Sequence, residues 1–305
     1  MYKLKNPQFH ASEIAEFLNL KLKGADFTVQ FPSSSKSFGD DSFFYLEEGE
    51  ALPAARLREH QRVLILAPKN LPAGKERYSF IVSPNPLADF IKVINELFIE
   101  FDVSAIAASA RIDPTARLGK NVSVGENSVV GPGVVIGANT RVLHNVVITG
   151  RVEIGAHCII KNNTTIGGTG FDFIKDREGK PVNFPHIGRV VIGDRVWIGS
   201  NASVEIAALD DTAIGDDVKI DDLVQIGYNC AIGARSVVTA GVIVSRGVRV
   251  GENSWIAPNA SIVDGVVIGD NVTVGAGAVV TKDLKGNGVY VGNPARFLRG
   301  KKKGE

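Results

Sequence analysis

The feature that most constrains the fold is an aliphatic residue that recurs every six positions over most of the chain. The series runs from Ile112 to Ile166, resumes at Ile192, and continues to Val280 with one slip of four residues across the segment ALDD. Glycine usually follows the aliphatic residue, and most of the 33 glycines lie in the second half of the chain. Neither the 3.6-residue period of an amphipathic helix nor the two-residue alternation of a half-buried strand fits this pattern.

A six-residue period is typical of a β-helix, a solenoid built from short parallel strands. Each aliphatic residue points inward from a strand, and glycine tolerates the unusual backbone angles of the corner that follows. The fifth position is usually small or β-branched, as at Val146, Cys158 and Cys230. Three hexads close one triangular coil, and each coil covers the apolar surface of its neighbour. The sequence therefore predicts a mainly-β protein whose largest part is a parallel β-helix.

The regions that lack the period define the other segments of the chain. We expect a small α/β domain at 1–103, the β-helix at 104–288, and a C-terminal turn with a basic tail at 289–305. The non-periodic segment 167–190 should form a loop excursion from the β-helix. Such loops, rich in charged and aromatic residues, commonly cover a ligand.

Within the first 103 residues, the segment 12–20 is predicted to form a helix with Ser12 as its N-cap. A second helix is expected over 85–101, leading into the β-helix. Strands are predicted for the segments FTVQF, SFFYL, RVLILA and YSFIVS.

Composition excludes several classes of protein. The formal charge is +1, with 34 basic and 33 acidic residues, so bulk charge gives no reason to expect a nucleic-acid partner. No apolar run approaches the ~20 residues of a membrane span, and no signal peptide is apparent, so we expect a cytoplasmic protein. Cys158 and Cys230 occupy equivalent small-residue positions, which indicates packing rather than a disulfide or a metal site. Basic residues gather only at the C-terminus: Arg296, Arg299, Lys301, Lys302 and Lys303.

Four segments narrow the class further: SARIDPTARLGKNVSVG, the loop TGFDF…FPHIGRVVIGDRVWIG, ALDDTAIG and IDDLVQIGYN. Together they resemble the UDP-3-O-acylglucosamine N-acyltransferases of lipid A synthesis, a family of hexapeptide-repeat acyltransferases. The resemblance implies a left-handed β-helix, a homotrimer, and active sites in the clefts between neighbouring subunits. It also implies a nucleotide-linked amino sugar as substrate and an N-terminal domain that recognises uridine.

The resemblance assigns site residues one by one. The family's general base, a histidine, corresponds to Tyr228, and a second family histidine corresponds to Gly265. Gln225 and Asn229 match the family motif. Asp222 replaces an asparagine, and the backbone N–H that stabilises the oxyanion corresponds to Arg246. These assignments are implied by the resemblance alone.

Tyrosine has a pKa of about 10 and is a poor base at neutral pH, so we expect Tyr228 to position rather than to accept a proton. The substrate amine, with a pKa of about 7.7–8.0, can supply its own neutral fraction. Other residues could replace the missing base or bind the substrate: His186, Glu205 and Asp211. Phe171 of the loop is a further candidate for substrate binding, and the resemblance makes Phe43 the nearest match to the aromatic residue that stacks on uracil.

The C-terminus departs from the lipid A family. The segment GNPAR resembles the ending of sugar acetyltransferases, in which the backbone and a basic residue lie along coenzyme A. The resemblance therefore assigns acyl-CoA as co-substrate, bound by Gly292, Asn293, Pro294 and Arg296. An arginine there can pair with a phosphate.

Three alternatives remain open. The chain could be a divergent lipid A acyltransferase that uses acyl carrier protein, or a non-catalytic β-helix module. A zinc enzyme of the γ-carbonic anhydrase type would need three histidines. The first run of coils holds only His144 and His157, which we interpret as turn residues, so we expect no metal.

Overall fold

The computed structural model describes residues 2–5, 8–73, 77–101 and 106–301. The chain separates into two compact units, Met1–Val103 and Ser104–Glu305. The expected boundary at 103/104 falls at residues outside the described ranges, as do Lys302 and Lys303 of the basic tail. No helix in the described part of the chain is long and apolar enough to cross a membrane.

The N-terminal unit is built on a five-stranded sheet. Its strands, in order of neighbours, are β3 (Leu22–Lys23), β8 (Tyr78–Val82), β7 (Val63–Ala67), β6 (Ser42–Tyr45) and β5 (Phe31–Pro32). Two short ladders pair β1 (Tyr2–Leu4) with β9 (Ile99–Phe101), and β2 (Phe9–His10) with β4 (Thr28–Val29). The helices are α1 (Ala11–Phe17), α2 (Ala54–Leu57), α3 (Pro86–Val93) and the π-helical turn η1 (Ile94–Phe98). Apolar clusters cover both faces of the sheet, one around Phe43 and the other around Phe44.

Two boundaries in this unit differ from the sequence prediction. Helix α1 begins at Ala11 with His10 as its N-cap, so the prediction of Ser12 was wrong. The Ser12 N–H and hydroxyl instead donate to the Asp26 carboxylate at 3.0 and 2.7 Å. The second predicted helix was too long, because its last residues form β9 and pair with β1. Long-range pairing therefore overrides the local helical pattern at that point.

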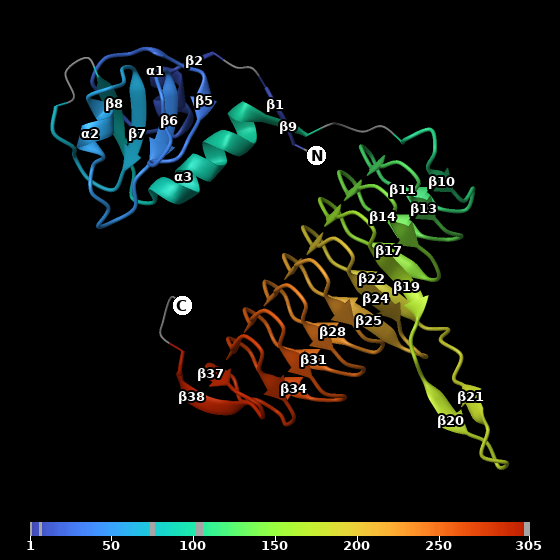
Figure 1. Cartoon of the computed structure of the whole chain (residues 1–305). Coiled ribbons are helices and arrows are strands. Elements are labelled where there is room, and N and C mark those ends of the chain that lie inside the picture. The colour runs from blue at the N-terminus through green and yellow to red at the C-terminus, as the bar shows by residue number, and fades with distance from the viewer. Residues whose placement is uncertain (1, 6–7, 74–76, 102–105, 302–305) are drawn as a thin grey trace. The chain divides into compact units, whose positions relative to one another are not determined.

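The C-terminal unit is a left-handed parallel β-helix with three sheets, which confirms the predicted fold (Figure 1). The β10 sheet contains β10 (Arg111–Ile112), β13 (Val129–Val130), β16 (Val147–Ile148), β19 (Thr165–Thr169), β24 (Ser203–Ile206), β27 (Gln225–Ile226), β30 (Ile243–Val244), β33 (Ser261–Ile262) and β36 (Val279–Val280). The β11 sheet contains β11 (Arg117–Leu118), β14 (Val135–Ile136), β17 (Val152–Ile154), β22 (Arg189–Ile192), β25 (Asp211–Ile214), β28 (Ala231–Ile232), β31 (Arg249–Val250) and β34 (Val267–Ile268). The β12 sheet contains β12 (Ser123–Val124), β15 (Arg141–Val142), β18 (Ile159–Ile160), β23 (Trp197–Ile198), β26 (Lys219–Ile220), β29 (Val237–Val238), β32 (Trp255–Ile256), β35 (Thr273–Val274), β37 (Gly288–Val291) and β38 (Arg296–Gly300).

The repeated aliphatic residues form one continuous core along the axis of the β-helix. Residues in the middle of the stack, such as Ile160 and Ile226, are fully buried. Ile112 and Leu118, in the first coil, are only partly buried. The difference follows from stacking, because a coil buries its apolar residues against the coils on either side.

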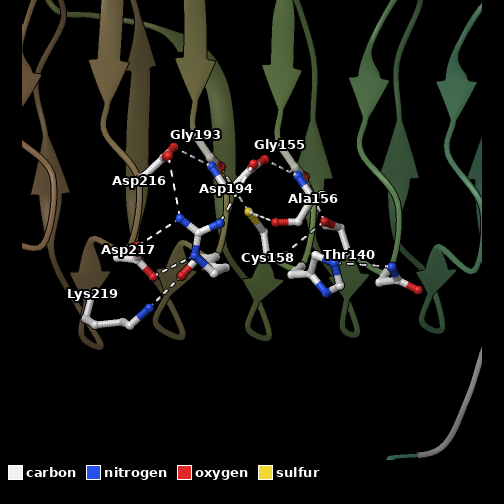
Figure 2. A network of polar contacts seen from close by, with 12 residues as sticks. Thr140, Gly155, Ala156, Cys158, Gly193, Asp194, Asp216, Asp217 and Lys219 are labelled. Carbon is white, nitrogen blue, oxygen red and sulfur yellow. Dashed lines mark hydrogen bonds and ion pairs between the residues drawn. The ribbon is translucent and has the colours of Figure 1, made fainter.

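Hydrogen bonds between coils satisfy the backbone at the corners. Figure 2 shows such a ladder at the corner between the β11 sheet and the β12 sheet. Asp194 accepts the Ala156 N–H at 2.7 Å, and Asp216 of the next coil accepts the Asp194 N–H at 2.8 Å. Arg195 donates two hydrogen bonds of 2.9 Å to the carboxylate of Asp217. These contacts fix the register of adjacent coils by pairing backbone groups that strands leave unpaired at a turn.

Both cysteines are buried and free, as the sequence predicts. Cys158 forms no disulfide. Its thiol lies 3.2 Å from the carbonyl of Gly193 in the ladder of Figure 2. Cys230 approaches the Ser245 carbonyl at 3.0 Å, and burial raises the pKa of its thiol to about 12. Such thiols are packing residues, because the reactive thiolate is disfavoured at neutral pH.

Candidate functional site

Both interruptions of the six-residue period fall at the same corner, where the β10 sheet turns into the β11 sheet. We call this edge the site corner; it comprises the excursion after β19 and the turns 207–210, 227–230, 245–248 and 263–266. The first and last residues of the predicted excursion 167–190 continue β19 and β22. Between them, β20 (Phe173–Lys175) and β21 (Pro181–Asn183) form a hairpin that projects from the stack in Figure 1.

Tyr228 lies at the centre of the site corner with 5% of its surface exposed. Its hydroxyl accepts a hydrogen bond of 2.9 Å from Nη1 of Arg246. Burial raises the pKa of Tyr228, and the nearby Asp172 carboxylate adds to this effect, while Arg246 opposes it. Tyr228 therefore remains protonated at neutral pH.

Arg246 connects three segments of the site corner. Its Nε donates to Asp264 at 2.9 Å, one coil further along, and its Nη1 lies 3.4 Å from Asp172 of the excursion. Tyr228, Arg246 and Asp264 are spaced by 18 residues, which is three hexads. One full turn of the β-helix thus stacks them on one edge.

Glu205 faces a hollow on one side of Tyr228. Its Oε2 accepts the Tyr228 N–H at 3.1 Å, and its Oε1 accepts a hydrogen bond from Gln225 at 3.3 Å. The hollow measures about 210 Å³ and is also lined by Phe171 and Arg246. Phe171 is 87% exposed, so its ring is available to a ligand. A half-buried carboxylate therefore lines this hollow beside Tyr228.

A larger hollow of about 550 Å³ lies on the other side of Tyr228, lined in part by Asn229, Asp210 and Gly265. Asn229 has a left-handed backbone (φ 59°), and its side chain accepts the Ala208 N–H at 2.9 Å. Asn229 therefore holds the turn of the ALDD segment against Tyr228. Gly265, which stands at the position that the sequence comparison assigned to a second histidine, lines this hollow without a side chain.

His186, near the end of the excursion, packs against Tyr228. The two rings meet edge to face with centroids 4.6 Å apart. The imidazole Nδ1 lies 3.0 Å from the carbonyl of Phe184, so Nδ1 carries the proton and donates it to that carbonyl. The Nε2 atom is the one buried side-chain nitrogen or oxygen in the described part of the chain that has no hydrogen-bond partner. A lone pair without a partner thus lies on a ring that packs against Tyr228.

Gly170, near the start of the excursion, lies close to Tyr228, Glu205 and His186. A Cβ atom at this position would overlap Tyr228 Cδ1, and it would lie 2.7 Å from Glu205 Oε2 and 3.1 Å from His186 Nε2. Only glycine allows this approach. Gly170 and Asp172 could not be recognised as site residues from the sequence, because the excursion has no period. The Arg246–Asp264 pair, in contrast, could have been found from its 18-residue spacing.

Two predicted site residues lie elsewhere. Asp222 is at the neighbouring corner, between the β12 and β10 sheets, where it pairs with Lys161 at 2.7 Å and accepts the Ser200 N–H at 2.6 Å. The hydrogen bond from Lys161 lowers the pKa of Asp222. Asp211 binds Arg189 through two hydrogen bonds of 2.9 and 2.8 Å at the base of the excursion. Both carboxylates are thus held in ion pairs, and their role in the site stays a prediction.

Phe43 cannot serve as an exposed platform for a nucleobase, and that prediction was wrong. It is fully buried in the N-terminal unit, with ring centroids 4.7 Å from Phe90 and 6.1 Å from Phe98. Tyr45, two residues further along β6, instead lines an open hollow of about 360 Å³ with Pro32.

The two histidines of the β-helix that lie outside the excursion, His144 and His157, are turn residues. His144 lies at the corner between the β12 and β10 sheets, where its Nδ1 accepts the Glu126 N–H at 2.9 Å. His157 has a left-handed backbone (φ 58°) at the corner between the β11 and β12 sheets. The described residues contain no group of three or more His, Cys, Asp or Glu side chains that could hold a metal ion.

The GNPAR segment closes the end of the β-helix. Gly292 has a φ of 93°, the Asn293–Pro294 bond is cis, and the turn joins β37 to β38. The Gly292 carbonyl accepts the Val279 N–H at 3.1 Å. Arg296 donates to its neighbouring carbonyl of Ala295 at 2.9 Å. The acyl-CoA contacts expected for this segment remain a prediction.

Two family models match the repeats. The model described as bacterial transferase hexapeptide (six repeats) matches residues 104–138, 133–168 and 247–282. The model described as hexapeptide repeat of succinyl-transferase matches 189–221 and 223–258.

Among curated proteins, UDP-3-O-acylglucosamine N-acyltransferases from several strains of Coxiella burnetii are 34% identical to this chain over 151 residues. The alignment covers 43% of this chain and 44% of the relative. The chain therefore matches less than half of the length of these relatives.

Solved structures share the fold. The Francisella novicida UDP-N-acetylglucosamine acyltransferase is similar with a TM-score of 0.60 at 23% identity, over 66% of this chain and 72% of that chain. The Moraxella catarrhalis UDP-N-acetylglucosamine O-acyltransferase gives a TM-score of 0.59 at 24% identity, over 65% and 76% of the two chains. With its hexapeptide repeats matched on both sides of the excursion, the chain belongs to the bacterial hexapeptide-repeat transferase family.

Proposed function

We propose that this protein is a homotrimeric N-acyltransferase that moves an acyl group from acyl-CoA to the amine of a nucleotide-linked amino sugar, for a bacterial surface polysaccharide. The observation that carries the proposal is the hollow beside Tyr228, where Glu205 and Arg246 line one space. The names of the curated relatives, which are N-acyltransferases of a UDP-linked sugar, support the class of acceptor.

The Glu205 carboxylate and the Arg246 backbone N–H can each stabilise one of the two charges that develop in amide formation. The amine nitrogen attacks the thioester carbonyl carbon, the C–S bond breaks, and the thiol of the donor leaves. Glu205 accepts a hydrogen bond from the amine and stabilises the positive charge on its nitrogen, and the released proton passes through this carboxylate to solvent. Negative charge meanwhile develops on the carbonyl oxygen, where a backbone N–H provides the usual stabilisation.

The Arg246 N–H is available for that oxyanion. It makes no hydrogen bond to any residue of the described ranges. A Cβ on Gly227, which lines the same hollow, would lie 2.9 Å from the Arg246 nitrogen. The glycine therefore leaves the N–H uncovered. Tyr228 serves as a positioning residue, because its neutral hydroxyl holds the Arg246 side chain beside this N–H.

Activity can be tested directly with the full chain. We expect an amide product, detected by mass spectrometry, when the protein is incubated with acetyl-CoA or a short 3-hydroxyacyl-CoA and a panel of UDP- and dTDP-linked amino sugars. Acyl carrier protein loaded with the same acyl groups forms the second arm. Product only in that arm would show that the donor assignment is wrong. The absence of product in both arms, with trimers intact by light scattering, would favour a non-catalytic module.

Tyr228→Phe should lower kcat/KM only about five- to tenfold, because it removes one hydrogen bond worth about 1 kcal/mol. The pH–rate profile should keep its shape, since Tyr228 does not ionise in this range. Tyr290→Phe is a matched control, because that hydroxyl also makes one hydrogen bond, which it donates to the Lys285 carbonyl at 2.9 Å, and because it lies on β37 of the β12 sheet rather than at the site corner. A loss above a thousandfold in Tyr228→Phe alone would mean that the hydroxyl takes part in the chemistry.

A further inference from the structure

The N-terminal unit contains an open hollow of its own. It measures about 360 Å³, within the range of about 300–1,000 Å³ that is typical of small-molecule sites. It lies past the carboxyl ends of the parallel strands β5 and β6, whose last residues are Pro32 and Tyr45. Ligands bind outside the carboxyl ends of the strands in open α/β sheets. We call this space the Tyr45 hollow; its lining includes Pro32, Tyr45, Glu47, Glu50, Phe90 and Ile94.

Aromatic rings form part of the wall of the Tyr45 hollow. The ring centroids of Tyr45 and Phe90 lie 4.9 Å apart at an interplanar angle of 48°. Phe43 is fully buried, and its ring centroid lies 4.7 Å from that of Phe90, so it supports the wall from within the core. The Ser33 N–H donates to the Phe43 carbonyl at 2.8 Å, which anchors the loop after β5. The wall is therefore preorganised, and aromatic rings attract cations through their quadrupole.

Two carboxylates in the lining have no cation as a partner. Glu47 and Glu50 follow β6, and both residues are exposed. Glu50 Oε2 accepts the Glu47 N–H at 2.9 Å, which fixes the turn between them. Neither glutamate forms an ion pair with any of the described residues, and no lysine, arginine or histidine is among those that line the hollow. The hollow therefore carries uncompensated negative charge.

This charge disfavours a ligand whose phosphates enter the hollow. Phosphates bind most strongly to arginine and lysine, which the described lining does not contain. Placing like charges next to each other is costly in a binding site. Carboxylates beside aromatic rings attract positive charge instead. The lining thus fits a cation better than the uridine nucleotide that the sequence resemblance implies for this unit.

We propose that the Tyr45 hollow binds a small ligand that carries an ammonium group. The ammonium lies against the Tyr45 ring and pairs with Glu47 and Glu50, while Phe90 and Ile94 contact the body of the ligand. Quaternary amines, primary alkylamines and amino sugars share this chemistry, so the test includes one probe of each kind. The proposal does not depend on the proposed acyl transfer, because it uses residues of the N-terminal unit alone.

Binding is measured by isothermal titration calorimetry on the full chain with choline, putrescine, glucosamine and UDP. The uncharged isostere of choline, in which carbon replaces nitrogen, is the control for the role of charge. We expect saturable binding of the cations that weakens as salt is added, and binding of the isostere that is about tenfold or more weaker. The cation that binds most tightly identifies the source of the ammonium group. UDP should show no binding that depends on Tyr45.

Variants of the lining test the contacts one kind at a time. Glu47→Gln combined with Glu50→Gln should weaken cation binding about tenfold and reduce its dependence on salt. Glu48→Gln is the matched control, because Glu48 is exposed on the same turn and is not among the residues that line the hollow. Tyr45→Leu should weaken binding about fivefold or more, whereas Tyr45→Phe keeps the ring and should retain it. Circular dichroism and thermal unfolding confirm that the variants are folded.

Four results would overturn the proposal. They are no binding of any of the three cations, equal binding of the uncharged isostere, an equal loss in Glu48→Gln and in the double variant, and UDP binding that exceeds that of every cation and is lost in Tyr45→Leu. The last would make the hollow a nucleotide site. Acyl transfer without cation binding would refute the Tyr45 hollow and leave the proposed function standing. Cation binding that depends on Tyr45, without any acyl transfer, would do the reverse.

Discussion

Gly170→Ala should lower kcat/KM for acyl transfer about 100-fold or more, because a displacement of 1 Å in a positioning element can cost about that factor. The added methyl group would overlap the Tyr228 ring and crowd the Glu205 carboxylate and the His186 imidazole. Tyr228 and Glu205 are fixed by the coils of the β-helix. The excursion must therefore move away from the site corner, taking Asp172 and Phe171 with it.

The chain offers a close control for this substitution. Gly168 lies two residues earlier in the same segment, and a Cβ atom there would meet nothing within 4 Å. Gly168→Ala should therefore keep the activity of the parent protein. Thermal unfolding should be nearly unchanged in both variants, because neither residue belongs to the continuous core of the β-helix. Full activity in Gly170→Ala would show that the excursion does not take part in the site.

The β-helix could be predicted from the sequence because its interactions repeat. Each inward residue packs against equivalents six and eighteen positions away, so one period specifies both the strands and their stacking. The prediction that Cys158 and Cys230 are packing residues follows from the same regularity. The burial of the repeated aliphatic residues weakens at the first coil of the stack, where Ile112 and Leu118 are partly buried.

The site could be predicted only where it follows that regularity. Tyr228 and Arg246 differ by 18 residues and meet at one corner, whereas Asp222 precedes Tyr228 by six residues and therefore lies at the neighbouring corner. The contacts of Gly170, Asp172 and His186 could not be predicted, since a non-periodic excursion gives no spacing from which to place them. In the N-terminal unit, local signals located β6 and the helix α3, but not the packing of Phe90 and Phe98 that buries Phe43.

Glu205→Gln should reduce kcat about 100- to 1,000-fold, the cost of losing one charge-stabilising group in a preorganised site. The change removes the charge but keeps the shape. The amide oxygen of glutamine can still accept the Tyr228 N–H that Glu205 Oε2 now accepts at 3.1 Å. The turn at Tyr228 should therefore persist, and KM for the sugar nucleotide should change less than kcat.

The pH dependence tests whether the substrate amine supplies its own neutral fraction. If Glu205 stabilises the charge on the amine, the rate should rise with the neutral fraction of the substrate amine, around pH 7.7–8.0, in both the parent and Glu205→Gln. Only the height of the profile should differ. Glu153→Gln, on the outward face of β17 and 3.6 Å from Arg189, is the matched control and should leave the profile unchanged.

His186 is the alternative to Glu205 as proton acceptor. Its Nε2 carries a buried lone pair without a hydrogen-bond partner among the described residues, and its ring packs against Tyr228. Full activity in Glu205→Gln, together with a loss of about 100-fold or more in His186→Gln, would transfer the role of proton acceptor to this imidazole. The pH–rate profile would then no longer follow the neutral fraction of the substrate amine.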